Sequence, residues 1–374
     1  MTPESPLPEG WSPRTLAAIR RKVLAWFDEH QRDLPWRKSR DPYAIWVSEV
    51  MLQQTTVAAV VPKFEQFLAA FPTVQHLAAA DEQTVLHHWQ GLGYYRRARH
   101  LHAAAKVLVG DFAGKLPDDP KIWAELPGVG RYILGAVLSQ AFDFRWPIVE
   151  ANTLRVFSRL CGSELDPRSG EGNKWIWAAA EALLPSKHVG EFNQAMMELG
   201  ALVCTPDSPA CGECPLNKEC MAFRSGLQDS IPPKVKRVPS QQLREVSLIV
   251  WSEGKVLVCQ RPATAGRWPL MWEVPTASVA DDEELASAAE RIAEKFGIAT
   301  DVGSPQLSIR YTVTRFTVTL TVFELNSPDP VPASSEYAVA KLCHPGELAG
   351  YPASTPQRKL FRRIVEGRKE LRLF

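Results

Sequence analysis

The sequence lacks any apolar run of about 18 residues, which is the length a helix needs to cross a bilayer. Its N-terminus also lacks the short apolar segment and small-residue cleavage site of a secretory signal. We therefore expect a cytoplasmic protein that does not enter a membrane. Charge of one sign is missing too, because 43 Lys and Arg face 42 Asp and Glu. Any affinity for nucleic acid must then come from local patches and backbone donors rather than from a global field.

Cysteine is scarce, with seven residues in a chain of 374, and the length of the chain and its lack of an export signal argue against the disulfide framework of a small secreted domain. Four of the seven nevertheless fall in one short stretch with the spacing C-x6-C-x2-C-x5-C. Thiolates this close together can enclose one metal centre, and the uneven spacing favours an iron–sulfur cluster. A structural zinc site and free buried cysteines are the alternatives. The candidate ligands are Cys204, Cys211, Cys214 and Cys220.

The length predicts two or three domains. Residues from about 11 to 223 carry apolar side chains at helical spacing, interrupted by Pro and Gly turns, and predict packed helical hairpins with little room for a sheet. Residues 225–240 are polar and rich in Pro and Lys, as in a linker. Beyond them, β-branched alternating stretches and one helix near 283–297 predict an α+β domain. The expected domains are 1–224 and 241–374, joined by that linker.

A glycine-containing turn, Leu126–Gly130, lies between two expected helices. Its glycines permit a tight turn in which backbone N–H groups point outward at the start of the next helix. Such a turn binds a phosphate group without reading base sequence. Gly128, Val129 and Gly130 are therefore candidate contacts to the DNA backbone, although the same motif also occurs in simple helical corners.

The cysteine spacing, together with LPGVGRYILGA upstream, resembles the endonuclease III family of helix-hairpin-helix DNA glycosylases over roughly residues 12–223. The resemblance implies an all-α, two-lobed domain that binds double-stranded DNA across its cleft and holds a [4Fe-4S] cluster. The motifs EVMLQQT, LPWR, GLGYYRRAR and FNQAMMELGALVC are more similar to the adenine DNA glycosylase (MutY) branch. That branch implies a monomeric repair enzyme, nucleoid-associated in a bacterium, that hydrolyses the N-glycosidic bond of adenine mispaired with 8-oxoguanine or guanine.

Cleavage of a base from deoxyribose builds positive charge on the sugar and negative charge on the base, a problem that two carboxyl groups solve. Glu49 lies in an apolar stretch, which favours its protonated form, and the resemblance implies that it protonates adenine at N7. The family's Asp-Gly-Asn is replaced here by Glu150-Ala151-Asn152. We expect Glu150 to stabilise the oxocarbenium and Asn152 to orient the site. The longer side chain puts that role in question, because a carboxylate displaced by about 1 Å costs roughly 100-fold in rate.

Tyr132 stands where bifunctional members of the family carry a nucleophilic lysine. Without an amine at that position Schiff-base chemistry has no nucleophile, so the resemblance implies a monofunctional enzyme that leaves an abasic site. Tyr132 also matches a tyrosine that some family members place beside the catalytic carboxylate. The target base must leave the stack to be reached. By resemblance, the base pocket is lined by Trp36, Arg37 and Gln194, and the residues that wedge into the vacated duplex are Gln54 and Tyr94.

The C-terminal domain resembles the Nudix-like domain that recognises 8-oxoguanine in this branch. Residues 290–298, ERIAEKFGI, stand in place of a Nudix box but lack its run of metal-binding glutamates, which argues against diphosphohydrolase activity. The family's Phe-Ser-His recognition loop maps onto Val313-Thr314-Arg315. We expect Thr314 and Arg315 to contact the lesion, with a weaker preference for the oxidised base because the aromatic residue is lost.

Two other functions remain open on the sequence alone. An endonuclease III-type pyrimidine glycosylase is opposed by Tyr132 and by the C-terminal domain. A catalytically weak DNA-binding homologue is favoured by one feature, the replacement of the family's aspartate by Glu150.

Overall fold

The computed structural model describes residues 6–234, 239–298, 301–327 and 334–371. The chain divides into two compact units, each described here by itself. The helical unit comprises Met1–Ala79 and His100–Lys236, and the sheet unit comprises Ala80–Arg99 and Arg237–Phe374. The division falls inside the segment predicted as a linker, of which residues 235–238 lie outside the described part. No helix among the described residues is long and apolar enough to cross a membrane.

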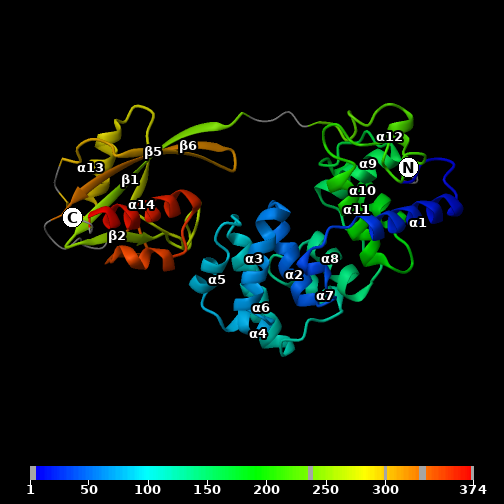
Figure 1. Cartoon of the computed structure of the whole chain (residues 1–374), viewed down its shortest axis with the longest axis horizontal. Helices are drawn as coiled ribbons and strands as arrows, with labels where there is room; N and C mark the ends of the chain where they lie inside the picture. Colours follow the sequence, from blue (N-terminus) through cyan, green and yellow to red (C-terminus); the bar gives the residue numbers. More distant parts are fainter. Residues whose placement is uncertain (1–5, 235–238, 299–300, 328–333, 372–374) are drawn as a thin grey trace. The chain divides into compact units, whose positions relative to one another are not determined.

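The helical unit contains no strand among its described residues, so the predicted helical array is confirmed (Figure 1). Its elements are α1 (Pro13–His30), η1 (Pro35–Arg37), α2 (Pro42–Leu52), α3 (Val57–Ala70), α4 (Val74–Ala79), α6 (Arg96–Phe112, from His100 onward), α7 (Pro120–Glu125), α8 (Arg131–Phe142), α9 (Ala151–Cys161), α10 (Gly170–Leu183), α11 (Val189–Leu202) and α12 (Met221–Arg224).

One core of this unit is built by α1, α9, α10 and α11. Ser12 caps α1 by accepting a hydrogen bond from the Thr15 amide at 3.2 Å, and Pro13 occupies the first turn, where its missing N–H costs nothing. The apolar face of α1 then packs on fully buried Phe157 and Phe192, and each such ring contributes about 1.5–3 kcal/mol by leaving water. Cys204, Cys214 and Cys220 rest against the same core.

The helix α2 is buried along almost its whole length, from Tyr43 to Met51. The apolar stretch that follows it in the sequence does not continue as one helix. Gln54 adopts a left-handed conformation, φ 56°, and Thr56 then takes the N-cap position of α3. This break ends α2 one turn after Glu49.

The hairpin between α7 and α8 depends on glycine. Gly128 has φ +77°, and a Cβ added there would lie 2.5 Å from the Cβ of His100, closer than real Cβ atoms approach. Gly130 is the N-cap of α8 with extended backbone, and both glycines are exposed. On the buried side, Trp123 of α7 meets Trp46 of α2 edge to face, with ring centroids 5.6 Å apart. This contact fixes the hairpin against the helix that carries Glu49.

The sheet unit contains α5 (Glu82–His88) and an α+β fold, as predicted for the C-terminal part. Its strands run in the order β3-β2-β1-β6-β5, with β4 paired to β1 and β7 to β2. Among the strands of the described residues, only β1 and β6 pair in parallel. The strands are β1 (Gln241–Ser252), β2 (Lys255–Gln260), β3 (Trp272–Glu273), β4 (Thr276–Val279), β5 (Leu307–Val313), β6 (Phe316–Asn326) and β7 (Val339–Cys343).

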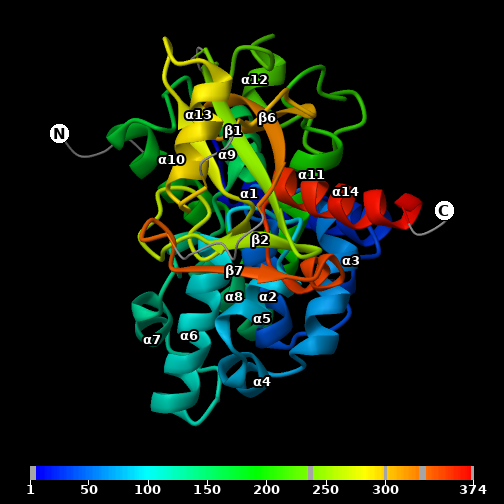
Figure 2. The same cartoon turned by 90° about the vertical axis from the view of Figure 1, so that its left-hand side faces the viewer.

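Two helices cover opposite faces of this sheet (Figure 2). The helix α13 (Leu285–Glu294) packs on the face to which β1 contributes Leu248, and α14 (Thr355–Leu371) packs on the face to which it contributes Ile249. The alternation of neighbouring side chains along a strand explains this division. The predicted helix near 283–297 is therefore confirmed, whereas α14 and the short η2 (Pro345–Gly350) were not expected from the sequence.

Candidate active site

Glu49 is the most deeply buried carboxylate of the expected site, with 2% of its surface exposed. Its Oε1 accepts a hydrogen bond from Nε2 of Gln140 at 2.7 Å, and its Oε2 accepts a short hydrogen bond from the hydroxyl of Tyr132. Both partners come from α8, the helix that follows the hairpin. Burial raises the pKa of Glu49 above its ordinary value, against the lowering effect of these two bonds. The site therefore favours a protonated acid.

Tyr132 is held as a neutral donor. Burial and the neighbouring Glu49 raise its pKa well above the ordinary value for tyrosine. A hydroxyl that keeps its proton can only stabilise and orient the carboxyl group beside it. The expectation that this tyrosine lies beside the catalytic carboxylate agrees with the observed hydrogen bond.

Glu150 occupies the N-cap position of α9 and bends back onto its own helix. Its Oε2 accepts from the Asn152 amide at 2.8 Å and its Oε1 from the Thr153 amide at 2.9 Å. The Glu150 amide in turn donates to Oγ1 of Thr153 at 2.9 Å, which completes a capping box. Burial raises the pKa of Glu150, and the two amide bonds oppose that rise. Glu49 and Glu150 also interact electrostatically, so the helix α9 brings the second carboxylate to the first.

Asn152 is oriented by a buried arginine rather than by Glu150 alone. Nη2 of Arg155 donates to Oδ1 of Asn152 at 2.9 Å and to the carbonyl of Gly200 at 2.8 Å. Nε of the same arginine donates to the carbonyl of Cys204 at 2.6 Å. One side chain thus joins the start of α9, the end of α11 and the start of the cysteine loop.

A second polar cluster joins η1 to α11. Nη1 and Nη2 of Arg37 donate to the two carboxylate oxygens of Glu198 at 3.2 and 2.9 Å, and its Nε donates to Oε1 of Gln194 at 3.0 Å. Arg32 makes a second pair of bonds to the same carboxylate. Trp36, the third expected pocket residue, is 6% exposed and meets Phe64 edge to face, so most of its ring packs in the core.

The two residues expected to wedge into DNA lie on different units. Gln54 is in the α2–α3 break of the helical unit. Tyr94 belongs to the sheet unit, has φ 45° and is 50% exposed. Arg97 stacks on the rings of Trp89 and Tyr94.

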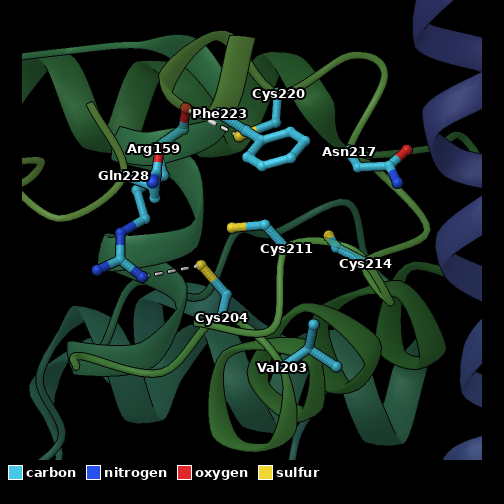
Figure 3. Close-up of a pocket in the computed structure, with 9 residues that line it drawn as sticks. All are labelled: Arg159, Val203, Cys204, Cys211, Cys214, Asn217, Cys220, Phe223 and Gln228. Atoms are coloured by element: carbon cyan, nitrogen blue, oxygen red, sulfur yellow. Dashed lines mark hydrogen bonds between the residues drawn. The ribbon is translucent and has the colours of Figure 1, made fainter. Parts of the chain in front are cut away.

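The four clustered cysteines line one small cavity between α9, α12 and the end of α11. Figure 3 shows their side chains around this space, with Phe223 beside Cys220. Arg159 donates from Nη1 to the sulfur of Cys204 at 3.4 Å. Burial raises the pKa of the Cys214 thiol to about 12, so a thiolate there requires a neighbouring cation.

No three His, Cys, Asp or Glu side chains in the described ranges are placed to share one metal ion. Four thiols that surround a cavity without converging on a point suit a multi-atom group better than a tetrahedral zinc, whose sulfur ligands lie about 2.3 Å from the metal.

In the sheet unit, Thr314 and Arg315 form the two-residue turn between β5 and β6. Thr314 has φ 51°, and its hydroxyl donates to the carbonyl of Val313 at 2.7 Å. Both turn residues are exposed, and the guanidinium of Arg315 lies 5.1 Å from the ring of Phe316. In the segment 290–298, which stands in place of a Nudix box, Glu294 is exposed and Lys295 pairs with Glu336.

Residues 47–178 match the family described as HhH-GPD superfamily base excision DNA repair protein, and residues 246–363 match the NUDIX domain. A mouse protein named adenine DNA glycosylase is 31% identical over 96% of this chain and 80% of its own length. The chain belongs to the adenine DNA glycosylase family. A rat adenine DNA glycosylase is 43% identical, but that match spans 56% of this chain and 42% of the rat protein.

Family membership agrees with the fold. The solved structure of a thermostable thymine-DNA glycosylase is 29% identical, covers 57% of this chain and 98% of its own, and superposes with a TM-score of 0.53. The expected arrangement of a helical glycosylase domain followed by a Nudix-like domain is thus confirmed for this adenine glycosylase family member.

Three polar residues of this adenine glycosylase family member were not expected from its sequence: Arg32, Gln140 and Glu198. Gln140 lies eight residues after Tyr132 on α8, about two turns along the same helix. Glu198 lies four residues after Gln194 on α11, a spacing that places both on one face. That spacing was the available signal, whereas nothing local in the sequence marks Arg32.

Proposed function

We propose that this protein is a monofunctional DNA glycosylase that hydrolyses the N-glycosidic bond of adenine mispaired with 8-oxoguanine or guanine. The observation that carries the proposal is the pairing of buried Glu49 with the donors Tyr132 and Gln140, next to a second carboxylate on Glu150. It acts as a monomer on double-stranded chromosomal DNA, which in a bacterium means the nucleoid. The product is an abasic site for base excision repair.

Glu49 supplies the proton. Its raised pKa favours the protonated carboxyl group, and transfer of that proton to N7 of adenine makes the base a better leaving group. The C1′–N9 bond then breaks and its electron pair leaves with the base. A water molecule adds to C1′, and the proton it loses returns to the Glu49 carboxylate. Tyr132 and Gln140 hold that carboxylate in place throughout.

Glu150 stabilises the positive charge that develops on the sugar. Two backbone amides fix its side chain, and each carboxylate oxygen keeps a further lone pair for interaction with the sugar. Asn152, which Arg155 holds, orients the same side of the site. Tyr132 carries no amine, so the reaction stops at the abasic site without strand cleavage.

Base flipping brings adenine to Glu49. Trp36, Arg37 and Gln194 line the base pocket, and Gln54 and Tyr94 fill the space that the base leaves. The hairpin amides at Gly128–Gly130 hold the DNA backbone by a phosphate group, without sequence preference.

Cys204, Cys211, Cys214 and Cys220 would hold a [4Fe-4S] cluster in the cavity that they line. When bound, the cluster would supply the positive charge that four buried thiolates need. It would link the parts of the cysteine loop structurally and would take no part in hydrolysis. In the sheet unit, Thr314 and Arg315 contact the 8-oxoguanine opposite the adenine. Their exposure at a tight turn supports this role.

One experiment separates this function from its alternatives. Duplexes with adenine opposite 8-oxoguanine, and duplexes with an oxidised pyrimidine, are incubated with the protein and analysed with and without hot alkali. We expect breakage at adenine that depends on alkali. Breakage at the pyrimidine without alkali would mean an endonuclease III-type enzyme, and no breakage would mean a catalytically weak homologue, which the Glu150 substitution favours.

A further inference from the structure

Glu198 is a buried carboxylate that no step of the proposed mechanism uses. It is 1% exposed and lies on α11, one turn after Gln194. Its Oε1 accepts from the backbone amide of Arg32 at 2.9 Å and from Nε of Arg32 at 2.8 Å, and its Oε2 accepts from Nη2 of Arg32 at 2.7 Å. Arg37 adds two more bonds to the same two oxygens. Such paired bonds fix both the position and the plane of each guanidinium.

The triad of Glu198, Arg32 and Arg37 is charged, and its paired hydrogen bonds restrict its motion. Burial alone would raise the pKa of Glu198, but the bonds from Arg32 and Arg37 outweigh it and lower the pKa to about 2. The carboxylate is therefore ionised at any physiological pH. The Arg37 side chain is only 11% exposed, and its Nη1 also donates to the carbonyl of Arg32 at 3.1 Å. Arg37 thus has little freedom to turn its Nε–H away from Gln194.

The orientation of the Gln194 side-chain amide is set by Nε of Arg37. A guanidinium can only donate hydrogen bonds, so the side-chain amide of Gln194 must turn its oxygen toward Arg37, as the 3.0 Å contact to Oε1 has it. The amide nitrogen then points away from Arg37. A group that meets this side of Gln194 meets N–H and not C=O.

We propose that Glu198 is a positioning residue that, through Arg37, makes Gln194 an obligate hydrogen-bond donor to the flipped base. The inference rests on the proposed function, which puts adenine in this pocket. With N7 facing Glu49, adenine offers N1 and N3 as acceptors on its other edges. Excision then requires a ring nitrogen with a lone pair opposite Gln194. A base without that acceptor leaves a buried N–H unpaired, which disfavours its excision.

The test measures single-turnover excision of adenine, 1-deazaadenine and 3-deazaadenine, each opposite 8-oxoguanine. We expect the unchanged protein to remove one of the two deaza bases about tenfold to a hundredfold more slowly than adenine, the range for one lost hydrogen bond in a buried site. Glu198→Gln releases Arg37 and lets the Gln194 amide rotate, so this ratio should fall severalfold. Gln194→Glu keeps the bond from Arg37 but has no N–H, and should lose the same discrimination. Differences in the intrinsic lability of the glycosidic bonds cancel, because each variant is compared with the unchanged protein on the same base.

Glu191→Gln is the matched control. Glu191 lies on the same helix and pairs with an arginine, Arg40, but is only partly buried, so its loss should leave the ratio unchanged. Thermal melting identifies a variant that fails to fold. Gln194→Glu leaves the triad intact and carries the test if Glu198→Gln is unfolded. Equal removal of all three bases by the unchanged protein, or an unchanged ratio in Gln194→Glu or in folded Glu198→Gln, would overturn the inference. If the unchanged protein removed no adenine, the proposed function would fall first and this inference with it.

Discussion

The buried position of Glu49 suits its proposed role as an acid, but it destabilises the folded protein when the carboxyl group ionises. Its carboxyl group is buried, and burial raises its pKa above the 4.5 of a free glutamate, whereas the unfolded chain retains that ordinary value. Below the ordinary value both states are protonated and the group favours neither. As pH rises from there toward the raised pKa, the unfolded chain loses its proton first and becomes favoured. The folded protein therefore loses stability across this window.

Replacement of this carboxyl group by an amide should remove the pH dependence. We expect Glu49→Gln to melt at a higher temperature than the unchanged protein at pH 8, because an uncharged amide is less costly to bury than a carboxylate. The difference should shrink toward pH 4. Melting curves at several pH values measure it, with exposed Glu65→Gln on α3 as the control. A difference that grew toward acid pH would show that Glu49 is stabilised as the carboxylate.

Glu150 has two roles that substitution can separate. As an N-cap it stabilises α9, typically by about 1 kcal/mol, and we propose that its carboxylate also stabilises the sugar cation. Glu150→Asp keeps a good cap and the charge, so we expect it to retain folding and measurable excision. Glu150→Gln keeps the side-chain length but not the charge, and should slow single-turnover excision by roughly 100-fold. Excision by Glu150→Gln near the rate of the unchanged protein would refute the assignment.

At the scale of elements, α9 is the part of the fold that joins the site to the cysteine loop. Its N-cap is Glu150, and one and two turns later Arg155 and Arg159 donate to the backbone of that loop, to Cys204 and Thr205. The same loop packs on the core of α1, α9, α10 and α11. Order in the loop and order in the helical unit therefore depend on each other.

Loss of one proposed cluster ligand should consequently lower the stability of the helical unit as well as that of the loop. We expect Cys204→Ser to bind less iron, to lose the visible absorbance of a cluster, and to lower the melting temperature of the helical unit. Iron content and calorimetry measure these changes. Cys343→Ser, a buried cysteine at the end of β7 in the sheet unit, should keep its iron. Full iron content in Cys204→Ser would exclude that cysteine as a ligand.

Helices and strands were predictable from the sequence where short-range residue patterns determine them. The helices α1 and α6 and the strands β1 and β6 follow from residue spacing, and the hairpin follows from Gly128 and Gly130. The break between α2 and α3 was hidden, because the apolar pattern runs on while the backbone at Gln54 turns left-handed. The helix α14 was missed in a strongly charged stretch at the end of the chain.

The site itself was predictable only in part. Glu49, Tyr132 and Glu150 were found by resemblance, and the structure brings the three together. Their supporting partners come from positions far apart in the chain. Arg32 reaches Glu198 across 166 residues, and such a contact depends on how helices pack rather than on any local pattern.

At the scale of the molecule, the helical unit holds the proposed acid Glu49, and the sheet unit holds the loop expected to contact the opposite base. The chain has almost no net charge, so this reading depends on individual donors such as Arg315 rather than on a field. The turn also lacks the aromatic residue that the family places beside its polar contacts, with Val313 in its place.

We therefore expect a modest preference for 8-oxoguanine over guanine opposite adenine, and expect Arg315→Ala to reduce it further. One charged hydrogen bond to the lesion is worth about tenfold to a hundredfold in rate. Single-turnover excision on the two duplexes measures the ratio, and Arg310→Ala, exposed on the same hairpin, is the matched control. A strong preference in the unchanged protein that vanished in Arg315→Ala would mean that the loop is fully competent without its aromatic residue.

The most direct test of the account is the pH dependence of adenine excision by the unchanged protein and by Glu49→Gln, opposite 8-oxoguanine under single-turnover conditions. If Glu49 is the acid, the rate of the unchanged protein falls as pH rises through the raised pKa of that residue. Glu49→Gln should be slower by about 10²–10⁴-fold at neutral pH and should lose this limb of the profile. A folded Glu49→Gln protein that excises adenine at the rate of the unchanged protein, with the same profile, would contradict the central claim.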